Sequence, residues 1–196
     1  MSLNTIIFPN QITASPYDRS ISNVLKLAWQ RIVLSLRTLP NWRGWIETVL
    51  ALAAVLIVGY FWTTRTGWYT SASQPLSWLW ASRFLETIWE PALFEELACR
   101  ALLTPHKSEK VTRRWRYGAI FLALVFYVSL HPLRGWYKME GDALIFLNWD
   151  AIVLIALLGI TCHISYQRTG SIWPGTLIHT AAVTGWWILK SGPPIS

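Results

Sequence analysis

The sequence has 196 residues, 53% of them hydrophobic and only 14% charged, with a formal net charge of +7. Soluble domains carry about 25% charged residues, so this composition excludes an ordinary soluble domain and favours a single domain embedded in a membrane. The positive charge does not indicate nucleic-acid binding, because the Lys and Arg residues lie in short runs between apolar segments.

Residues 1–45 are predicted to be a tail that carries an amphipathic helix. Over residues 21–38, apolar side chains recur at helical spacing, and polar side chains such as Lys26 and Arg37 occupy another face. This pattern is typical of a helix that lies on the membrane surface, although a soluble helix that caps a bundle shows the same pattern. Pro40 ends the segment.

Four segments are apolar enough to cross a membrane, and a fifth is interrupted by charges. The four are residues 46–62, 117–131, 143–164 and 172–189, and the fifth is 76–104. Pro91 divides this fifth segment, which predicts a shallow amphipathic piece over 76–90 and a buried helix over 91–104. The predicted fold class is therefore all-α, a multi-pass transmembrane bundle of about four to five spans over residues 46–190, followed by a short tail, 191–196.

The basic residues between the spans predict how the protein lies in the membrane. The N-terminal region and the 104–116 loop carry five Lys or Arg residues each, and the 165–171 loop carries one. The opposite connections carry only four: Arg65, Arg134, Lys138 and Lys190. Cytoplasmic loops are enriched in Lys and Arg, so the N-terminus is predicted to be cytoplasmic, or stromal if the membrane belongs to an organelle.

The most informative stretch is residues 94–100, where Glu95, Glu96 and Arg100 lie among apolar residues. Ionisable side chains at bilayer depth cost several kcal/mol each, and by default they mark a functional site. Glu96 and Arg100 are four residues apart and can pair on one helix face. Glu95 points about 140° away from Arg100. It is therefore available to accept a proton from water and return it to a leaving amine.

Two histidines are predicted to lie at the depth of Glu95. At 1.5 Å rise per residue, Glu95, His131 and His179 lie roughly 18, 22 and 14 Å from the ends of their segments. All three distances start from the same predicted cytoplasmic face. The sequence therefore predicts that one carboxylate and two imidazoles meet in a polar site within the membrane.

Taken singly, each of these residues also has a purely structural interpretation. Glu96 and Arg100 can be a buried ion pair that fixes the register of a helix. His131 can cap a helix end before Pro132, and His179 can be a core histidine with its hydrogen bonds satisfied. Their common depth is the observation that favours a functional site.

The order of these residues resembles the signatures of the CPBP family of intramembrane proteases, the CAAX-protease and bacteriocin-processing group that is also called Abi. Its first signature, Glu-Glu-x-x-x-Arg, is matched by Glu95, Glu96 and Arg100. Its second signature, Phe-x-x-x-His, is matched by Tyr127 and His131, with Tyr in place of Phe.

The third signature of that family is a His followed four residues later by Asn or Asp, after a Gly-Ser-x-Trp run. Here residues 170–173 supply the run and lead to His179, but Val183 stands at the last position. The three signatures occur in the family order, and the resemblance covers roughly residues 76–190.

The resemblance implies an intramembrane endopeptidase, similar to a type 2 CAAX prenyl protease, that hydrolyses peptide bonds of a membrane-associated or lipidated protein with a glutamate-activated water. On that basis Glu95 would be the general base and would hold the water with His131, and His179 would help to stabilise the oxyanion. Glu96 and Arg100 would shape the site or hold a substrate carboxylate. No cofactor is expected, and the alternative is a divalent metal such as Zn²⁺ on Glu95, His131 and His179.

Val183 motivates a second hypothesis about function. The contact that an Asn or Asp would make to the oxyanion or the water is missing, and losing one such donor costs about 10²–10³ in rate. The alternative is therefore a catalytically impaired membrane scaffold or assembly factor on the same fold. The expected partners are the lipid bilayer, a peptide or protein substrate and membrane-complex proteins, and nucleic acid is not among them.

Overall fold

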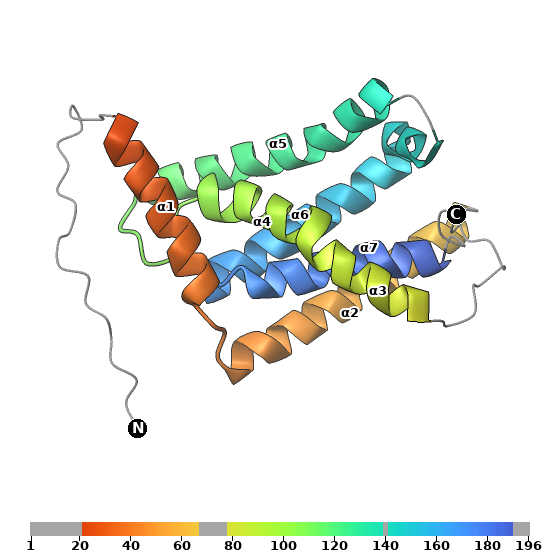
Figure 1. The fold of residues 1–196 in the computed structure, drawn as a ribbon, viewed down its shortest axis with the longest axis horizontal. Coiled ribbons are helices and arrows are strands. Elements are labelled where there is room, and N and C mark those ends of the chain that lie inside the picture. The colour runs from red at the N-terminus through yellow and green to blue at the C-terminus, as the bar shows by residue number, and fades with distance from the viewer. Residues whose placement is uncertain (1–20, 67–77, 139–140, 190–196) are drawn as a thin grey trace.

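The computed structural model describes residues 21–66, 78–138 and 141–189. All regular structure in these residues is helical, and the described part of the chain contains no strand, which confirms the predicted all-α class. Five long helices form the body of the protein (Figure 1). They are α1 (Ile21–Arg37), α2 (Trp42–Arg65), α5 (Arg113–Lys138), α6 (Trp149–Thr169) and α7 (Trp173–Leu189).

Four shorter helical pieces form the segment that carries the acidic residues, and a fifth lies in the connection before α6. The acidic segment consists of α3 (Trp78–Thr87), η1 (Ile88–Leu93), α4 (Phe94–Glu96) and η2 (Leu97–Leu102). It crosses α7 and runs back toward α1 in Figure 1. A 3₁₀ helix, η3 (Gly141–Leu147), precedes α6 and packs against α5.

Three of the described helices, α2, α5 and α6, are long and apolar enough to cross a membrane by length and composition. Helix α7 is also apolar but has only 17 residues. Exposed Trp115 and Trp136 mark the two ends of α5, roughly 32 Å apart at 1.5 Å per residue. The hydrocarbon core of a bilayer is about 30 Å thick, and tryptophan favours its two interfaces. The spacing therefore matches an integral membrane protein.

The acidic segment is interrupted one residue before Pro91. Glu90 has φ −137° and ψ 118°, outside the helical region, and helical backbone angles resume after it. A proline disfavours helical geometry at the residue that precedes it and has no amide hydrogen to donate. The break separates α3 from the part of the segment that holds Glu95 and Glu96.

Helix α5 is longer than the sequence predicts. The predicted span ends at His131, before Pro132, whereas α5 continues to Lys138. The proline removes one backbone hydrogen bond, but η3 packs along the continued helix, and the Phe146 ring lies 5.3 Å from the His131 ring. His131 is therefore held inside a helix rather than at its end.

Helix α1 lies across one end of the bundle (Figure 1). Its second half is bonded to the bundle, because the Ser35 carbonyl accepts from Ile172 N at 3.1 Å and the Leu36 carbonyl accepts from Trp173 Nε1 at 2.9 Å. Arg31 also pairs with Glu109 at 2.7 Å. The first half of α1 exposes apolar side chains: Ile21, Val24, Leu25 and Trp29. The second half of α1 therefore caps the bundle, as one of the two predictions for this helix has it. The first half has the exposed apolar side chains that the other prediction, a helix on the membrane surface, requires.

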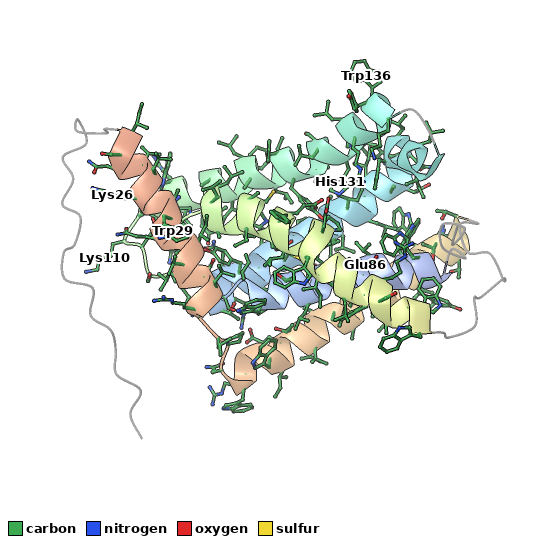
Figure 2. The ribbon with its side chains drawn as sticks, viewed as in Figure 1. Lys26, Trp29, Glu86, Lys110, His131 and Trp136 are labelled. Carbon is green, nitrogen blue, oxygen red and sulfur yellow. The ribbon has the colours of Figure 1, made fainter. Side chains whose placement is uncertain are left out.

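The two ends of the bundle differ in charge. Lys26 and Lys110 lie at the end that carries α1, while Trp136 lies at the opposite end, where α5 finishes (Figure 2). Helix α1, the loop between η2 and α5, and the first turns of α5 together hold eight of the 17 Lys and Arg residues. We call the first end the basic end and the second the far end.

Candidate active site

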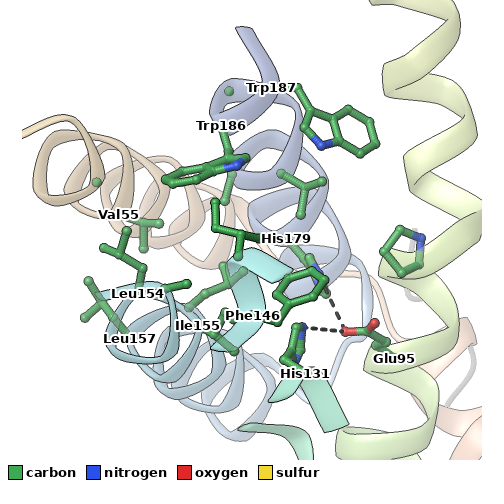
Figure 3. Close-up of a pocket in the computed structure, with 18 of the residues that line it drawn as sticks. Val55, Glu95, His131, Phe146, Leu154, Ile155, Leu157, His179, Trp186 and Trp187 are labelled. Atoms are coloured by element: carbon green, nitrogen blue, oxygen red, sulfur yellow. Dashed lines mark ion pairs between the residues drawn. The ribbon is translucent and has the colours of Figure 1, made fainter. Parts of the chain in front are cut away.

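The structure brings together the three residues that the sequence predicts to share one depth. Glu95 lies on α4, His131 on α5 and His179 on α7. His131 Nε2 is 4.0 Å and His179 Nε2 is 3.8 Å from the same carboxylate oxygen, Oε2 of Glu95 (Figure 3). Three side chains from three separate helices therefore converge on one oxygen atom.

Glu96 and Arg100 form the ion pair that their spacing predicts. Arg100 Nε lies 3.2 Å from Glu96 Oε2, and both side chains are fully buried. Arg100 Nη2 also donates to the Gly159 carbonyl at 3.3 Å, and the guanidinium lies 4.4 Å from the centre of the Tyr127 ring. These contacts tie the helix that carries Glu95 to α5 and α6, because a buried charge is stable only when it is compensated.

His179 contacts both glutamates, which sequence reasoning did not predict. Its Nδ1 lies 3.2 Å from Glu96 Oε1, while its Nε2 faces Glu95. A carboxylate oxygen can only accept, so Nδ1 of His179 carries the proton that is donated to Glu96. The buried ion pair therefore orients the ring that faces the reactive carboxylate.

His131 is oriented by the backbone in a similar way. Its Nδ1 donates to the Tyr127 carbonyl at 3.0 Å, which leaves Nε2 of the neutral ring as an acceptor that faces Glu95. The Tyr127 ring packs against both imidazoles, with ring centres 5.0 Å from His131 and 6.1 Å from His179. Among the described residues, Glu95 Oε2 is buried and has no hydrogen-bond partner. A polar atom in this position is ready to bind a small polar molecule.

The site opens into a cavity of about 1080 Å³. Glu95, His131 and His179 line it, whereas Glu96 and Arg100 do not. Much of the wall is apolar, and part of it is visible in Figure 3: Val55, Leu154, Ile155, Trp186 and Trp187. Of the two roles expected for Arg100, shaping the site fits this arrangement better than holding a substrate carboxylate, because the side chain is enclosed by its own partners and does not line the cavity.

The other charged side chains on the cavity wall are exposed and come from the far end of the bundle. Glu86 and Glu90 lie on α3 and η1, and Arg134 and Lys138 lie on the last turns of α5. The cavity thus runs from the buried carboxylate toward the end of the molecule that is opposite α1.

Val183 also lines the cavity, four residues after His179 on α7. The apolar side chain therefore stands in the site where the CPBP signature has an amide or a carboxylate. Thr180 and Thr184 lie beside it on the same helix, but neither lines the cavity, and both side chains are buried. Neither hydroxyl replaces the missing polar group.

Gly175 and Gly159 are site residues that sequence reasoning missed. A Cβ atom at position 175 would lie 2.6 Å from Glu96 Oε2, so any side chain there would displace the buried carboxylate. A Cβ at position 159 would lie 2.8 Å from Tyr127 Cδ1. The only signal in the sequence is a glycine within an apolar helix, which by itself indicates close packing of some kind but not its partner.

The distances around Glu95 also bear on the metal alternative. Ligand atoms about 2.0–2.1 Å from a tetrahedral zinc ion lie about 3.3 Å from one another. The separations of 3.8 and 4.0 Å between Glu95 and the two histidines are longer. Among the described residues, no group of three or more His, Cys, Asp or Glu side chains is arranged to hold a metal ion.

Comparison with known proteins identifies the family. The model of the type II CAAX prenyl endopeptidase Rce1-like family matches residues 75–184, which include Glu95, His131 and His179. No curated protein and no solved structure matches the chain. The family match covers more than half of the sequence and includes α4, α5 and most of α7, the helices that carry the converging carboxylate and imidazoles. The chain belongs to the type II CAAX prenyl endopeptidase Rce1-like family.

Proposed function

We propose that the protein is an intramembrane endopeptidase in which Glu95 activates water for attack on a peptide bond. The observation that carries this proposal is the convergence of His131 Nε2 and His179 Nε2, at 4.0 and 3.8 Å, on Glu95 Oε2 at the wall of a cavity. Family membership supports the reaction class, and the geometry supports the roles of the individual residues.

The gap between Glu95 and His131 suits a bridging water. A separation of 4.0 Å is too long for a direct hydrogen bond, and both facing atoms, the carboxylate oxygen and the unprotonated Nε2, accept hydrogen bonds. One water molecule can donate a hydrogen to each of them. Its oxygen lone pairs then point away from both residues, toward a carbonyl carbon placed in the cavity.

In the proposed reaction, the water oxygen bonds to the carbonyl carbon while its proton passes to Glu95. The carbonyl π electrons move to the oxygen and form a tetrahedral oxyanion. His179, when its Nε2 is also protonated, donates to this oxyanion, and Glu96 offsets the positive charge of the ring through Nδ1. The C–N bond then breaks as Glu95 returns its proton to the leaving amine, which restores the carboxylate.

We propose that the substrate carries a prenyl group. The family name specifies prenylated CAAX peptides, and the cavity offers an apolar wall next to the reacting carboxylate. Val55, Leu154 and Trp186 come from α2, α6 and α7, so the apolar surface is built by the spanning bundle itself. Burial of an isoprenoid chain gains about 0.8 kcal/mol per CH₂ group, which is enough to retain a short peptide.

A cleavage assay tests the proposal. Protein purified in detergent is expected to cleave a fluorogenic farnesylated CAAX peptide at a single bond, identified by mass spectrometry, and to cleave the unprenylated peptide much more slowly. Because the proposed mechanism routes no step through a metal, activity is expected to survive dialysis against EDTA. Loss of activity in EDTA with recovery on addition of Zn²⁺ would instead support the metal alternative.

Replacing Val183 with Asn is expected to increase the rate. The new amide would stand in the cavity on the helix of His179 and could donate to the oxyanion. A single donor of this kind contributes up to about 10²–10³ in kcat. The matched control is Ala182→Asn, which places the same amide in the cavity wall one residue away. Equal rates for wild type and both variants would show that position 183 does not reach the reacting atoms.

A structural scaffold is the competing hypothesis, and no contact in the described site favours it. Val183 removes one polar group but leaves the carboxylate and both oriented histidines facing the cavity. A scaffold has no need of a buried carboxylate oxygen without a hydrogen-bond partner, since such a group costs about 1–3 kcal/mol of stability. We therefore propose that the protein is a peptidase. Absence of cleavage in the assay above would favour the scaffold hypothesis instead.

A further inference from the structure

Helix α1 carries one apolar stripe that runs the length of the helix. At 100° per residue, Ile21, Leu25, Ile32 and Leu36 fall within about 60° of one another. In the second half of the helix, Ile32 and Leu36 pack against buried side chains of η2 and α6. In the first half, Ile21 and Leu25 are 79% and 64% exposed. The same stripe therefore continues past the bundle, where no described residue buries it.

The opposite face of the first half of α1 is polar. Lys26 and Gln30 lie about 110° and 150° from the middle of the stripe, and both are exposed. Trp29 lies between the two faces and is 66% exposed. A helix with this distribution typically lies in the plane of a membrane interface, with its apolar face about 5–10 Å into the boundary between headgroups and acyl chains. The position of α1 across the end of the bundle where α5 begins suits this placement (Figure 1).

The end of the bundle that carries α1 has an excess of positive charge. Residues 1–45 and residues 103–116 each contain five Lys or Arg residues and one carboxylate. Pairing within these segments can therefore neutralise at most two of the ten cations, and the pair of Arg31 with Glu109 is one such contact. The exposed cations of α1, of the loop between η2 and α5 and of the first turn of α5 are Lys26, Arg37, Lys107, Lys110, Arg113 and Arg114. A surface with this charge attracts anionic rather than neutral partners.

We propose that the first half of α1 and the basic loop between η2 and α5 form a docking surface for anionic lipid headgroups. The occupant is the bilayer leaflet at the basic end. Its acyl chains cover the apolar stripe, and its headgroups contact Lys26 and Lys110, which both lie at this end (Figure 2). Basic residues are attracted to an anionic membrane surface within about a Debye length of it. A neutral protein partner would cover the stripe but would leave the positive charge uncompensated.

Docking of the first half of α1 would also hold helices that build the candidate active site. In the second half, the Leu36 carbonyl accepts from Trp173 Nε1 at the start of α7, at 2.9 Å. Arg31 Nη1 donates to the Leu102 carbonyl at the end of η2, at 3.3 Å. Helix α7 carries His179, and η2 contains the arginine of the buried ion pair. Helix α1 thus connects the membrane surface to two helices of the site.

The test follows α1 in the full-length protein reconstituted into lipid nanodiscs. Leu25→Cys is labelled through its thiol with the fluorophore nitrobenzoxadiazole. The two native cysteines, Cys99 and Cys162, are buried and should not react. In nanodiscs that contain phosphatidylglycerol, lipids with a doxyl group on an acyl chain are expected to quench the fluorophore at position 25. The matched control Gln30→Cys places the same label on the polar face, about 140° away around the helix, where quenching should be weak.

The charge of the lipid is the second variable. The ratio of docked to undocked α1, obtained from the quenched fraction at position 25, is expected to be at least about fivefold higher with phosphatidylglycerol than with phosphatidylcholine alone, which is the contribution of one Lys or Arg near an anionic surface. Raising the salt concentration from about 0.1 to 1 M shortens the Debye length from about 10 to 3 Å and should lower this ratio.

Two double variants in the same labelled protein locate the charge that matters. Lys26→Gln/Lys110→Gln is expected to lower the docked ratio in phosphatidylglycerol nanodiscs by between about fivefold and 25-fold, at about fivefold for each cation. Arg65→Gln/Lys138→Gln removes the same number of exposed cations from the far end and should leave the ratio unchanged.

Three results would overturn the proposal. They are equal quenching in the two lipids, equal losses in the two double variants, and a blue-shifted fluorophore at position 25 that doxyl lipids do not quench, which would show that protein rather than lipid covers the stripe. None of these measurements involves cleavage. Docking can therefore fail while the peptidase proposal stands, and the reverse is equally distinguishable.

Discussion

Replacing Glu95 with Gln is expected to lower kcat/KM for the farnesylated CAAX peptide by about 10²–10⁴, the range that general acid–base catalysis contributes. The amide has nearly the same shape as the carboxylate, but it cannot take the proton of the attacking water. Glu95 Oε2 has no hydrogen-bond partner among the described residues, so the substitution breaks no contact that holds the fold. Initial rates of peptide cleavage measure the effect.

The matched control for this prediction is Glu86→Gln. Glu86 also lines the cavity, but it is exposed, pairs with Arg83 and lies on α3, beyond the break at Glu90. Its substitution should leave the rate within about threefold of wild type, and both variants should keep the wild-type melting temperature. A Glu95→Gln protein that cleaves as fast as the Glu86→Gln protein would remove Glu95 from the mechanism.

Replacing Arg100 with Met is expected to destabilise the protein by about 3–5 kcal/mol, because the charge of fully buried Glu96 would lose its compensating partner. The guanidinium also bonds the Gly159 carbonyl and packs on Tyr127, so these contacts are lost with it. Thermal unfolding in detergent, followed by intrinsic tryptophan fluorescence, measures the change. Activity is expected to fall as well, since the pair positions the helix that carries Glu95.

A double substitution distinguishes loss of charge balance from loss of packing. Glu96→Gln together with Arg100→Met removes both charges, and the Gln oxygen can still accept from His179 Nδ1. This variant should regain much of the stability that Arg100→Met loses. Removing the exposed Arg168–Glu47 pair through Arg168→Gln is the control and should hardly change the melting temperature. Equal losses in all three variants would contradict the assigned role of the buried pair.

The convergence of the site could be predicted because it follows from helix geometry. Rotation by 100° per residue separates Glu95 from the Glu96–Arg100 pair, and the rise per residue places His131 and His179 at its depth. The structure has both features. These predictions needed only residue spacing and a common membrane face, which are properties of single helices.

The remaining features depend on contacts between helices, which spacing along one helix does not determine. The contact of His179 with Glu96 requires the rotation of α7 relative to α4, and it brings Gly175 against the same carboxylate. The enclosure of Arg100 depends on Gly159 and Tyr127 from two other helices. Pro132 predicted a helix end, but packing of η3 against α5 outweighs the local effect of the proline.

The cavity runs toward the far end of the bundle, whereas α1 and the loop between η2 and α5 lie at the basic end, and this has a consequence for biosynthesis. Whichever way the nascent chain inserts, α1 and the basic loop face one compartment. The far end, where Arg134 and Lys138 line the cavity that leads to Glu95, faces the other compartment. Retention of the basic end in the cytoplasm, as the sequence predicts, would make the exoplasmic or lumenal side the source of substrate. The same signal that orients the protein would then also select the pool of proteins that it processes.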